Sequence, residues 1–213
     1  MDKDKRISNA VIRRLPKYYR YLKELLRNEI YRTSSNELSN MTGFSASQIR
    51  QDLNNFGGFG QQGFGYDVFN LSNEIGKIIG ADKNYKIMIV GAGNIGQAIA
   101  NYTGFYENGY EVIAIFDNNP SLVGSTIKDI TIKDIADVEA YLSENFVNIA
   151  VICTPKSVSQ AIADVLIKCG IKAIWNFAPS DIKGPDDVSI ENVHLNESLF
   201  SLTYHYNKRE REK

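Results

Sequence analysis

Apolar and polar positions follow a helical period in the first part of this 213-residue chain. Over residues 9–29 the apolar side chains recur every three to four positions, which is the stripe of an amphipathic helix. Pro16 interrupts the stripe, so we predict a short turn first and a helix entered properly at Pro16. The apolar positions of the stripe are Val11, Leu15, Tyr18, Leu22 and Leu25.

Two short helices follow, each opened by a serine with an acid or amide three residues later. Ser34 and Glu37 open residues 36–41, and Ser45 and Gln48 open residues 46–55. A three-residue turn containing Gly43 separates them, which is typical of a helix-turn-helix; the alternative is an ordinary helical hairpin. The second helix hides Ile49 and Leu53. It presents side chains that can donate to base edges and phosphates, namely Ser47, Gln48, Arg50, Gln51 and Asn54.

Residues 56–66, FGGFGQQGFGY, place five glycines between aromatic residues. We interpret this segment as a β-hairpin wing whose tip, Gln61, Gln62 and Gly63, lies along a minor groove. The alternative is a flexible linker, but linkers rarely alternate glycine with Phe and Tyr. Residues 68–79 then read as a helix that joins two domains.

The remainder of the chain alternates apolar strands with helices, which predicts a doubly wound α/β fold with a mostly parallel sheet. The expected strands are residues 86–90, 112–116, 127–132, 147–154, 171–177 and 188–195. The expected helices are residues 97–102, 132–145, 157–169 and 196–206.

A glycine motif follows the first of these strands. Gly91, Gly93 and Gly96 have the spacing G-x-G-x-x-G, and Asp117 lies 21 positions beyond the last glycine, at the end of the next strand. That context is typical of a dinucleotide site: the glycines allow a tight turn, close approach to a pyrophosphate and close packing of the helix. The helix N-terminus attracts the phosphates. We expect the loop residues Gly91, Ala92, Gly93, Asn94, Ile95 and Gly96 to bind the cofactor.

Asp117 would accept hydrogen bonds from a ribose, and no arginine follows it to pair with a 2′-phosphate, so we expect NAD⁺ or NADH rather than the phosphorylated form. Thr154 and Pro155 follow another strand, at the end where such sheets bind ligands. The alternative is a glycine turn that binds nothing.

Charge is distributed unevenly, although the whole chain has a net charge of only −1. Residues 1–60 carry 11 Lys and Arg against 6 Asp and Glu, whereas residues 61–213 carry 13 against 19. A basic first part suggests a polyanion partner. The basic residues off the first apolar stripe form either a solvated face or a phosphate-facing or interdomain surface; they are Arg13, Arg14, Lys17, Arg20 and Lys23.

Other classes of protein receive little support. No apolar run reaches the length of a membrane span, and no signal peptide opens the chain. Cys153 and Cys169 have neither metal-site spacing nor the look of a disulfide framework, so we expect no metal. A dehydrogenase would need an acid–base group beside the nicotinamide, yet His194 and His205 both lie near the C-terminus, and we expect no catalytic residue.

Six blocks of sequence, in order and covering nearly the whole chain, resemble the Rex redox-sensing transcriptional repressors. They are RRLPKYYRYL (13–22), SQIRQDLNNFGGFGQQGFGY (47–66), VGAGNIGQAIANYTGF (90–105), FDNNPSLVG (116–124), TPKSVSQAIADVLIKCGIKAIWNFAP (154–179) and NVHLNESL (192–199).

The resemblance implies a cytoplasmic homodimer that binds a palindromic operator in double-stranded DNA. It implies a winged-helix domain over residues 1–80, a Rossmann domain over 81–195, and a helix and tail over 196–213 swapped onto the partner subunit. NADH would favour release from the operator, and NAD⁺ would permit or support binding. The alternatives are an oxidoreductase with an accessory basic domain, or a DNA-binding protein with a vestigial Rossmann domain.

Site residues carried over by motif are Arg14 on the first helix, counted with the DNA contacts, and Arg20 in an interdomain network. Tyr102 would lie near the nicotinamide and couple cofactor state to domain position. Two residues depart from the family pattern: Gln51 stands where the family often has Lys, and His194 stands where it often has Asp. Glutamine pairs best with adenine, so we predict a shifted operator consensus. His194 in place of Asp predicts a coupling network that is rewired or pH-sensitive. The alternative is that His194 merely packs at the interface.

Overall fold

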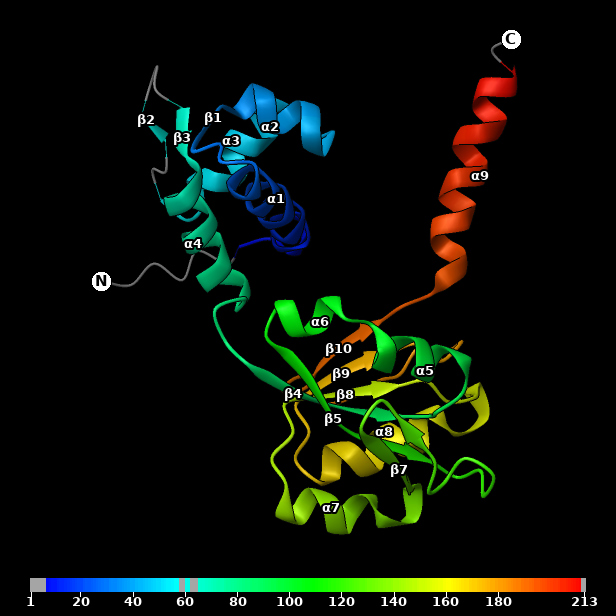
Figure 1. Cartoon of the computed structure of the whole chain (residues 1–213). Coiled ribbons are helices and arrows are strands. Elements are labelled where there is room, and N and C mark those ends of the chain that lie inside the picture. Colours follow the sequence, from blue (N-terminus) through cyan, green and yellow to red (C-terminus); the bar gives the residue numbers. More distant parts are fainter. Residues whose placement is uncertain (1–6, 58–59, 62–64, 212–213) are drawn as a thin grey trace. The chain divides into compact units, whose positions relative to one another are not determined.

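A computed structural model describes residues 7–57, 60–61 and 65–211 of the chain (Figure 1). These residues divide into two compact units, residues 1–83 and residues 84–213. Each unit has its own hydrophobic core.

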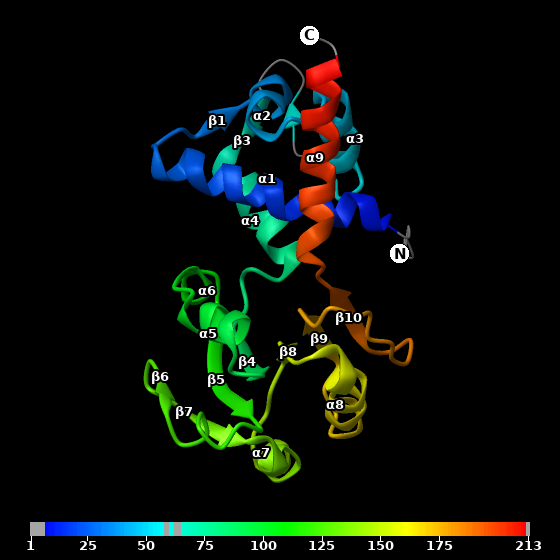
Figure 2. The same cartoon turned by 90° about the vertical axis from the view of Figure 1, so that its right-hand side faces the viewer.

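The N-terminal unit is a helix-turn-helix with a small sheet. Its helices are α1 (Asn9–Arg27), α2 (Ser35–Thr42), α3 (Ala46–Asn54) and α4 (Val68–Ile79). Strands β1 (Arg32–Thr33), β2 (Gly60–Gln61) and β3 (Gly65–Asp67) form an antiparallel sheet in the order β1-β3-β2. Helices α1 and α4 pack together, and the buried side chains of all four helices form one core (Figures 1 and 2). This confirms the predicted winged helix.

Helix α1 begins earlier than the sequence predicted. It starts at Asn9, with the Ser8 side chain as its N-cap, and continues through Pro16 as one helix. Proline lacks the N–H that would reach the carbonyl of Ile12, but Ile12 is 41% exposed, so water can replace that hydrogen bond. Val11, in the turns before Pro16, is buried, and this burial stabilises the longer helix.

The serine caps of α2 and α3 differ from each other. Around α2 the full capping box forms: the Ser34 hydroxyl accepts from the Glu37 N–H at 3.1 Å, and the Glu37 carboxylate accepts from the Ser34 N–H at 2.7 Å. At α3 only half of the box forms. Ser45 accepts from the Gln48 N–H at 3.2 Å, but the Gln48 side chain turns to Asp52 instead.

The C-terminal unit contains a seven-stranded sheet. Its strands are β4 (Tyr85–Val90), β5 (Tyr110–Asp117), β6 (Thr126–Ile127), β7 (Ile130–Asp134), β8 (Ile149–Ile152), β9 (Ala173–Asn176) and β10 (Ser189–Asn192). The order is β10-β9-β8-β4-β5-β7-β6, and only the β6–β7 pair is antiparallel. Strands β5 to β7 are added on one side of β4, and β8 to β10 are added on the other, so the strand order reverses between β4 and β8. This confirms the doubly wound, mostly parallel sheet.

Helices cover both faces of this sheet (Figure 1). Ile87 and Ile89 of β4 point to the core beneath α5 (Asn94–Asn101) and α6 (Gly104–Glu107). Met88 and Val90, between them in sequence, point to the core beneath α7 (Val138–Glu144) and α8 (Lys156–Lys168). A strand buried on both faces reads as a continuous apolar run, as the sequence does here. The last helix, α9 (Leu195–Arg211), has no buried residue within the described chain.

Between residues 126 and 145 the structure corrects the sequence prediction. The predicted strand 127–132 is a hairpin of β6 and β7, with Lys128 at its turn in the left-handed region, φ 50°. The predicted helix 132–145 is instead the end of β7, a 3₁₀ turn (η1, Ile135–Asp137) and α7. β-Branched residues extend β7, and the Asp134 side chain accepts from the Ala136 N–H, so helical structure begins only after Asp134. Helix α6 and strand β1 were not predicted.

The capping box predicts a pH-dependent contribution to stability. The Ser34 backbone N–H, and then its hydroxyl, hold the pKa of Glu37 below its ordinary value. A lowered pKa stabilises the folded state above the unfolded pKa of about 4.3, and that gain is lost as pH falls through the folded value. We expect Ser34→Ala to reduce the free energy of unfolding by about 1 kcal/mol at pH 7, and by less at pH 3.

Urea denaturation of the full chain, followed by circular dichroism, measures this effect. Ser45→Ala is the matched control, because the residue three positions after Ser45 is Gln48, which has no carboxylate to titrate, so its penalty should not vary with pH. Equal pH dependence for the two variants would contradict the assignment.

Candidate functional site

The glycine loop after β4 depends on two close approaches. A Cβ on Gly96 would lie 1.8 Å from the carbonyl oxygen of Gly91, and a Cβ on Gly91 would lie 2.6 Å from the carbonyl oxygen of Cys153. A Cβ on Gly93 would meet no protein atom within 4 Å. Gly96 therefore allows α5 to pack closely on the loop, and Gly91 allows the loop to pack closely on the chain after β8. Gly93 faces open space where a ligand can approach.

Asp117, at the end of β5, is bonded directly to this loop. One carboxylate oxygen accepts from the Ala92 N–H at 2.6 Å, and the other accepts from the Asn119 N–H at 2.8 Å. A carboxylate has about four lone-pair positions, so each oxygen can still accept from a ribose hydroxyl. The carboxylate thus holds the loop while keeping capacity for a ligand.

A cavity of about 1,030 Å³ opens at the point where strand order reverses. Six of the predicted cofactor residues line it: Gly91, Gly93, Ile95, Asp117, Thr154 and Pro155. Ala92 in the loop, and Asn94 and Gly96 in the first turn of α5, do not line the cavity. The sequence did not single out the apolar wall that α8 contributes, which includes Val158, Ala161, Ile162 and Val165.

Tyr102 is outside this lining. It caps the C-terminal end of α5, is 60% exposed, and its ring lies 4.9 Å from that of Phe105, edge to face. Its predicted role beside a nicotinamide therefore stays a prediction.

Two side chains at the end of β8 bear on chemistry in the cavity. Thr154 Oγ1 is buried and has no hydrogen-bond partner within the described residues, so it is a polar atom open to a ligand. Burial raises the pKa of the Cys153 thiol to about 12, so this sulfur stays protonated at neutral pH and is a poor nucleophile. Cys153 and Cys169 are both free.

The exposed face of α3 carries most of the predicted DNA contacts. Ser47, Arg50, Gln51 and Asn54 are exposed, whereas Gln48 is half-buried. Arg50 donates from Nη1 to the Ser35 hydroxyl at 2.8 Å, which ties its guanidinium to the first turn of α2. For the wing, Gln61 ends β2, and Gln62 and Gly63 lie outside the described residues.

Asp52 is a residue beside the predicted DNA-contacting face that the sequence reasoning missed. It is fully buried on α3 and binds Arg14, Tyr18 and Gln48. Arg14 and Gln48 were predicted to contact DNA; both side chains are hydrogen-bonded to Asp52, and their contact with DNA stays a prediction. The available signal was the helical period, which places position 52 on the same side of α3 as Ile49 and Leu53.

The predicted coupling residues lie in different units: Arg20 belongs to the N-terminal unit, and Tyr102 and His194 belong to the C-terminal unit. The Arg20 guanidinium carbon lies 4.8 Å from the centroid of the Tyr21 ring. His194, after β10, is bonded through Nε2 to an Asp181 carboxylate oxygen at 2.7 Å. His194 therefore has a carboxylate partner within its own unit.

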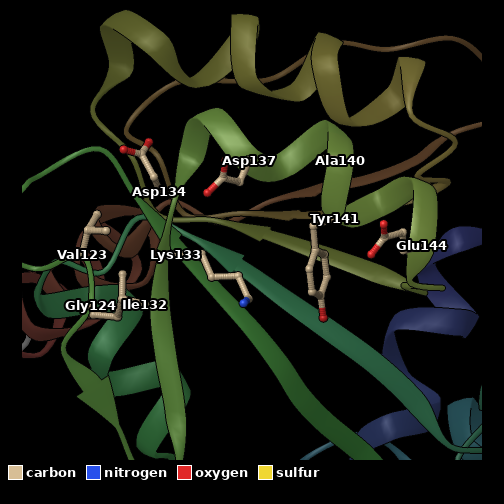
Figure 3. Close-up of a pocket in the computed structure, with 9 residues that line it drawn as sticks. All are labelled: Val123, Gly124, Ile132, Lys133, Asp134, Asp137, Ala140, Tyr141 and Glu144. Carbon is tan, nitrogen blue, oxygen red and sulfur yellow. The ribbon is translucent and has the colours of Figure 1, made fainter.

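A second cavity, of about 390 Å³, lies between β7 and α7 (Figure 3). Its carboxylates, Asp134, Asp137 and Glu144, are spread along the cavity, and Lys133 lies 5.8 Å from the Tyr141 ring centroid.

Across the described ranges, no group of three or more His, Cys, Asp or Glu side chains is placed to hold a metal ion. Among the helices that the structure describes, none is long and apolar enough to cross a membrane.

The loop geometry predicts opposite outcomes for two alanine substitutions. Gly96→Ala forces Cβ into the Gly91 carbonyl, so we expect a loss of about 3 kcal/mol or more in the free energy of unfolding. Gly93→Ala should leave stability unchanged but weaken dinucleotide binding at least 10-fold, because the new methyl group occupies the space of the pyrophosphate. Thermal melting and fluorescence titration with NADH measure the two effects. A Gly96→Ala protein that melts like wild type would contradict the packing argument.

Comparison with known proteins agrees with this geometry. Residues 82–180 match the family described as "CoA binding domain", and residues 6–54 match "Putative DNA-binding protein N-terminus". The redox-sensing transcriptional repressor Rex of Clostridium novyi is 60% identical over 204 residues, which cover 96% of this chain and 97% of that protein.

Two solved structures of a Rex-family repressor, RSP, are also similar. RSP in complex with β-NAD⁺ and operator DNA matches with a TM-score of 0.89 and 56% identity, covering 96% of this chain and 94% of that chain. RSP in complex with β-NADH matches with a TM-score of 0.88 and 53% identity, covering 96% of both chains. With this identity over nearly its full length, the chain belongs to the Rex family of redox-sensing transcriptional repressors.

Proposed function

We propose that this protein is a DNA-binding repressor that senses the ratio of NADH to NAD⁺ and leaves a palindromic operator when NADH binds. The observation that carries the proposal is the glycine loop held by Asp117 at the mouth of a large cavity. In the same chain, α3 exposes four polar side chains on a helix-turn-helix. The relative RSP forms complexes with both nucleotides and with operator DNA.

The switch must rest on a difference in affinity, because a ligand that binds two states equally shifts nothing. NAD⁺ and NADH differ mainly by one positive charge on the nicotinamide ring. Apolar side chains of α8 line one wall of the cavity, and burying a charge against such a wall is costly. A nicotinamide placed near Thr154 and Pro155 would therefore favour NADH. Tyr102, Arg20 and His194 are proposed to pass this difference to the DNA-binding domain.

For domain organisation we propose a winged-helix domain over 1–80, a Rossmann domain over 81–195, and a C-terminal helix and tail over 196–213 that docks on the partner of a homodimer. The exposed apolar side chains of α9 support this docking, with Leu199 57%, Phe200 72% and Leu202 64% exposed. A repressor meets chromosomal DNA in the cytoplasm of a bacterial cell, which is where we propose that it acts.

We propose that the protein is not an enzyme. Neither histidine lines the large cavity; His194 is bonded to Asp181, and His205 lies on α9. The one thiol in the cavity lining, Cys153, stays protonated at neutral pH because burial raises its pKa. These side chains offer no acid–base group to a substrate beside a nicotinamide.

Operator binding tests the proposal directly. Fluorescence anisotropy with a labelled palindromic duplex of TTGTGA-like half-sites, at fixed salt, should show binding that NADH reverses and NAD⁺ does not. Tight binding indifferent to both nucleotides would contradict redox sensing. No binding across varied operators would contradict the repressor function.

Asp117 provides a prediction about the adenosine end of the cofactor. Asp117→Ala removes charged hydrogen bonds to a ribose, so we expect NADH and NAD⁺ to lose affinity by a similar factor of about 10- to 100-fold. The ratio of the two affinities should stay near the wild-type value, because the ribose is common to both. Isothermal titration with each nucleotide measures this, and a changed ratio would place Asp117 at the nicotinamide instead.

Gln51 predicts a shift in operator sequence. A lysine reads guanine acceptors, whereas glutamine pairs with adenine, so the wild type should prefer a half-site with adenine at the contacted position. Gln51→Lys should move the preference toward guanine by about 10-fold or more, since a bidentate pair contributes roughly 1–3 kcal/mol. Selection from a randomised half-site library tests this. Equal preference of the wild type for both half-sites would contradict the prediction.

A further inference from the structure

Asp52 forms a completely bonded cluster inside the N-terminal unit. Its Oδ1 accepts from Arg14 Nη2 at 2.8 Å and from Gln48 Nε2 at 2.9 Å. Its Oδ2 accepts from Arg14 Nε at 2.6 Å and from the Tyr18 hydroxyl at 2.7 Å. Four donors fill the capacity of one carboxylate, so no position remains for water or DNA.

The cluster holds a fixed charge. Burial alone would raise the pKa of Asp52, but the hydrogen bonds from Arg14, Tyr18 and Gln48 outweigh it and hold the pKa below its usual value. For Tyr18, burial and then the bond to Asp52 raise the pKa, so its hydroxyl stays a donor. At any pH used for DNA binding the cluster therefore pairs a carboxylate with a guanidinium.

The hydrogen bonds of the cluster are directional, whereas the apolar contacts of α3 are not, so the cluster can fix the orientation of this helix. Ile49 and Leu53 bury the same side of α3, but apolar contacts tolerate rotation and sliding of a helix. The two parallel bonds between Arg14 and Asp52 fix both distance and angle between α1 and α3. The opposite side of α3 carries the predicted DNA contacts, and the direction in which they point depends on the orientation of the helix. They are Ser47, Arg50, Gln51 and Asn54.

The cluster also pairs the positive charge of Arg14 with a carboxylate. The Arg14 side chain is 20% exposed, and its charge is paired with Asp52, whose side chain is 1% exposed. Without the carboxylate, Arg14 would be a long cationic side chain at the edge of the helix-turn-helix, available to any DNA phosphate. Contacts to phosphates add affinity without sequence information.

We infer that Asp52 is a positioning residue that sets operator specificity: it holds α3 in one orientation through Arg14 and Tyr18, and it keeps Arg14 from binding phosphates nonspecifically. This inference rests on the proposed DNA-binding function. It assigns Arg14 and Gln48 to the support of the recognition helix rather than to its DNA-contacting face.

Binding to operator and to a scrambled duplex, measured by anisotropy across salt concentrations, tests the inference. Asp52→Asn keeps the shape but removes the charge. We expect its operator-to-scrambled affinity ratio to fall at least 10-fold, and its salt slope to steepen by about 0.9 as Arg14 gains a phosphate. Arg14→Lys keeps the charge but loses the parallel bonds, and should lower the ratio as well. Tyr18→Phe removes one bond and should lower it less.

Asp67→Asn is the matched control. Asp67 caps α4 in the same unit through a 2.8 Å bond from the Asn70 N–H, and the substitution makes the same change in net charge. Its affinity ratio should stay at the wild-type value. An equal fall for Asp67→Asn and Asp52→Asn would overturn the inference, because net charge alone would then explain the effect.

The remaining outcomes are also decisive. Circular dichroism reports whether Asp52→Asn folds; if it does not, an unchanged affinity ratio in both Arg14→Lys and Tyr18→Phe overturns the inference. A wild type that prefers its operator, with variants that keep the wild-type ratio, overturns the inference alone. A wild type that binds neither duplex overturns the proposed function, and the inference with it.

Discussion

The close approach of Gly96 to the carbonyl oxygen of Gly91 is the contact on which the dinucleotide-binding loop of the C-terminal unit depends. Because no Cβ intervenes, α5 can begin at Asn94, soon after β4 ends at Val90, and its N-terminus faces the loop. Asp117 then reaches across from β5 to the Ala92 N–H, and Thr154 follows β8 on the other side of the loop. The cavity lies at this point because three chain segments meet there at the carboxyl ends of parallel strands.

The N-terminal unit uses a carboxylate in a comparable way. Asp117 orients a loop that faces a ligand, and Asp52 orients a helix that faces DNA in the proposed function. In both places one residue accepts hydrogen bonds from separate segments of the chain, and the side chains beside it are left open to a partner. Asp117 and Asp52 therefore contribute to specific recognition by orienting other groups of the protein. Neither carboxylate needs to distinguish one ligand or one DNA sequence from another.

Much of the fold follows from apolar periodicity and glycine spacing. The strand–glycine loop–helix unit, the following strand to Asp117 and the helix-turn-helix all appear where the sequence predicts them. The failures have local causes. Pro16 looks like a helix start, yet burial of Val11 carries the helix past it. Asp134 is a polar residue in a helical pattern, and its side chain caps a turn instead. The hydrogen bonds of Arg14 and Gln48 to Asp52 could not be predicted, because only tertiary packing brings these side chains together.

In the proposed function, NADH and operator DNA bind to states of the protein that exclude each other. Binding free energies are linked reciprocally, so NADH affinity must fall on operator-bound protein by the factor that NADH weakens operator binding. Measuring NADH affinity by titration, with and without saturating operator duplex, tests this linkage. We expect the affinity for NADH to fall at least 10-fold on operator-bound protein and the affinity for NAD⁺ to change little. An NADH affinity that operator leaves unchanged would contradict it.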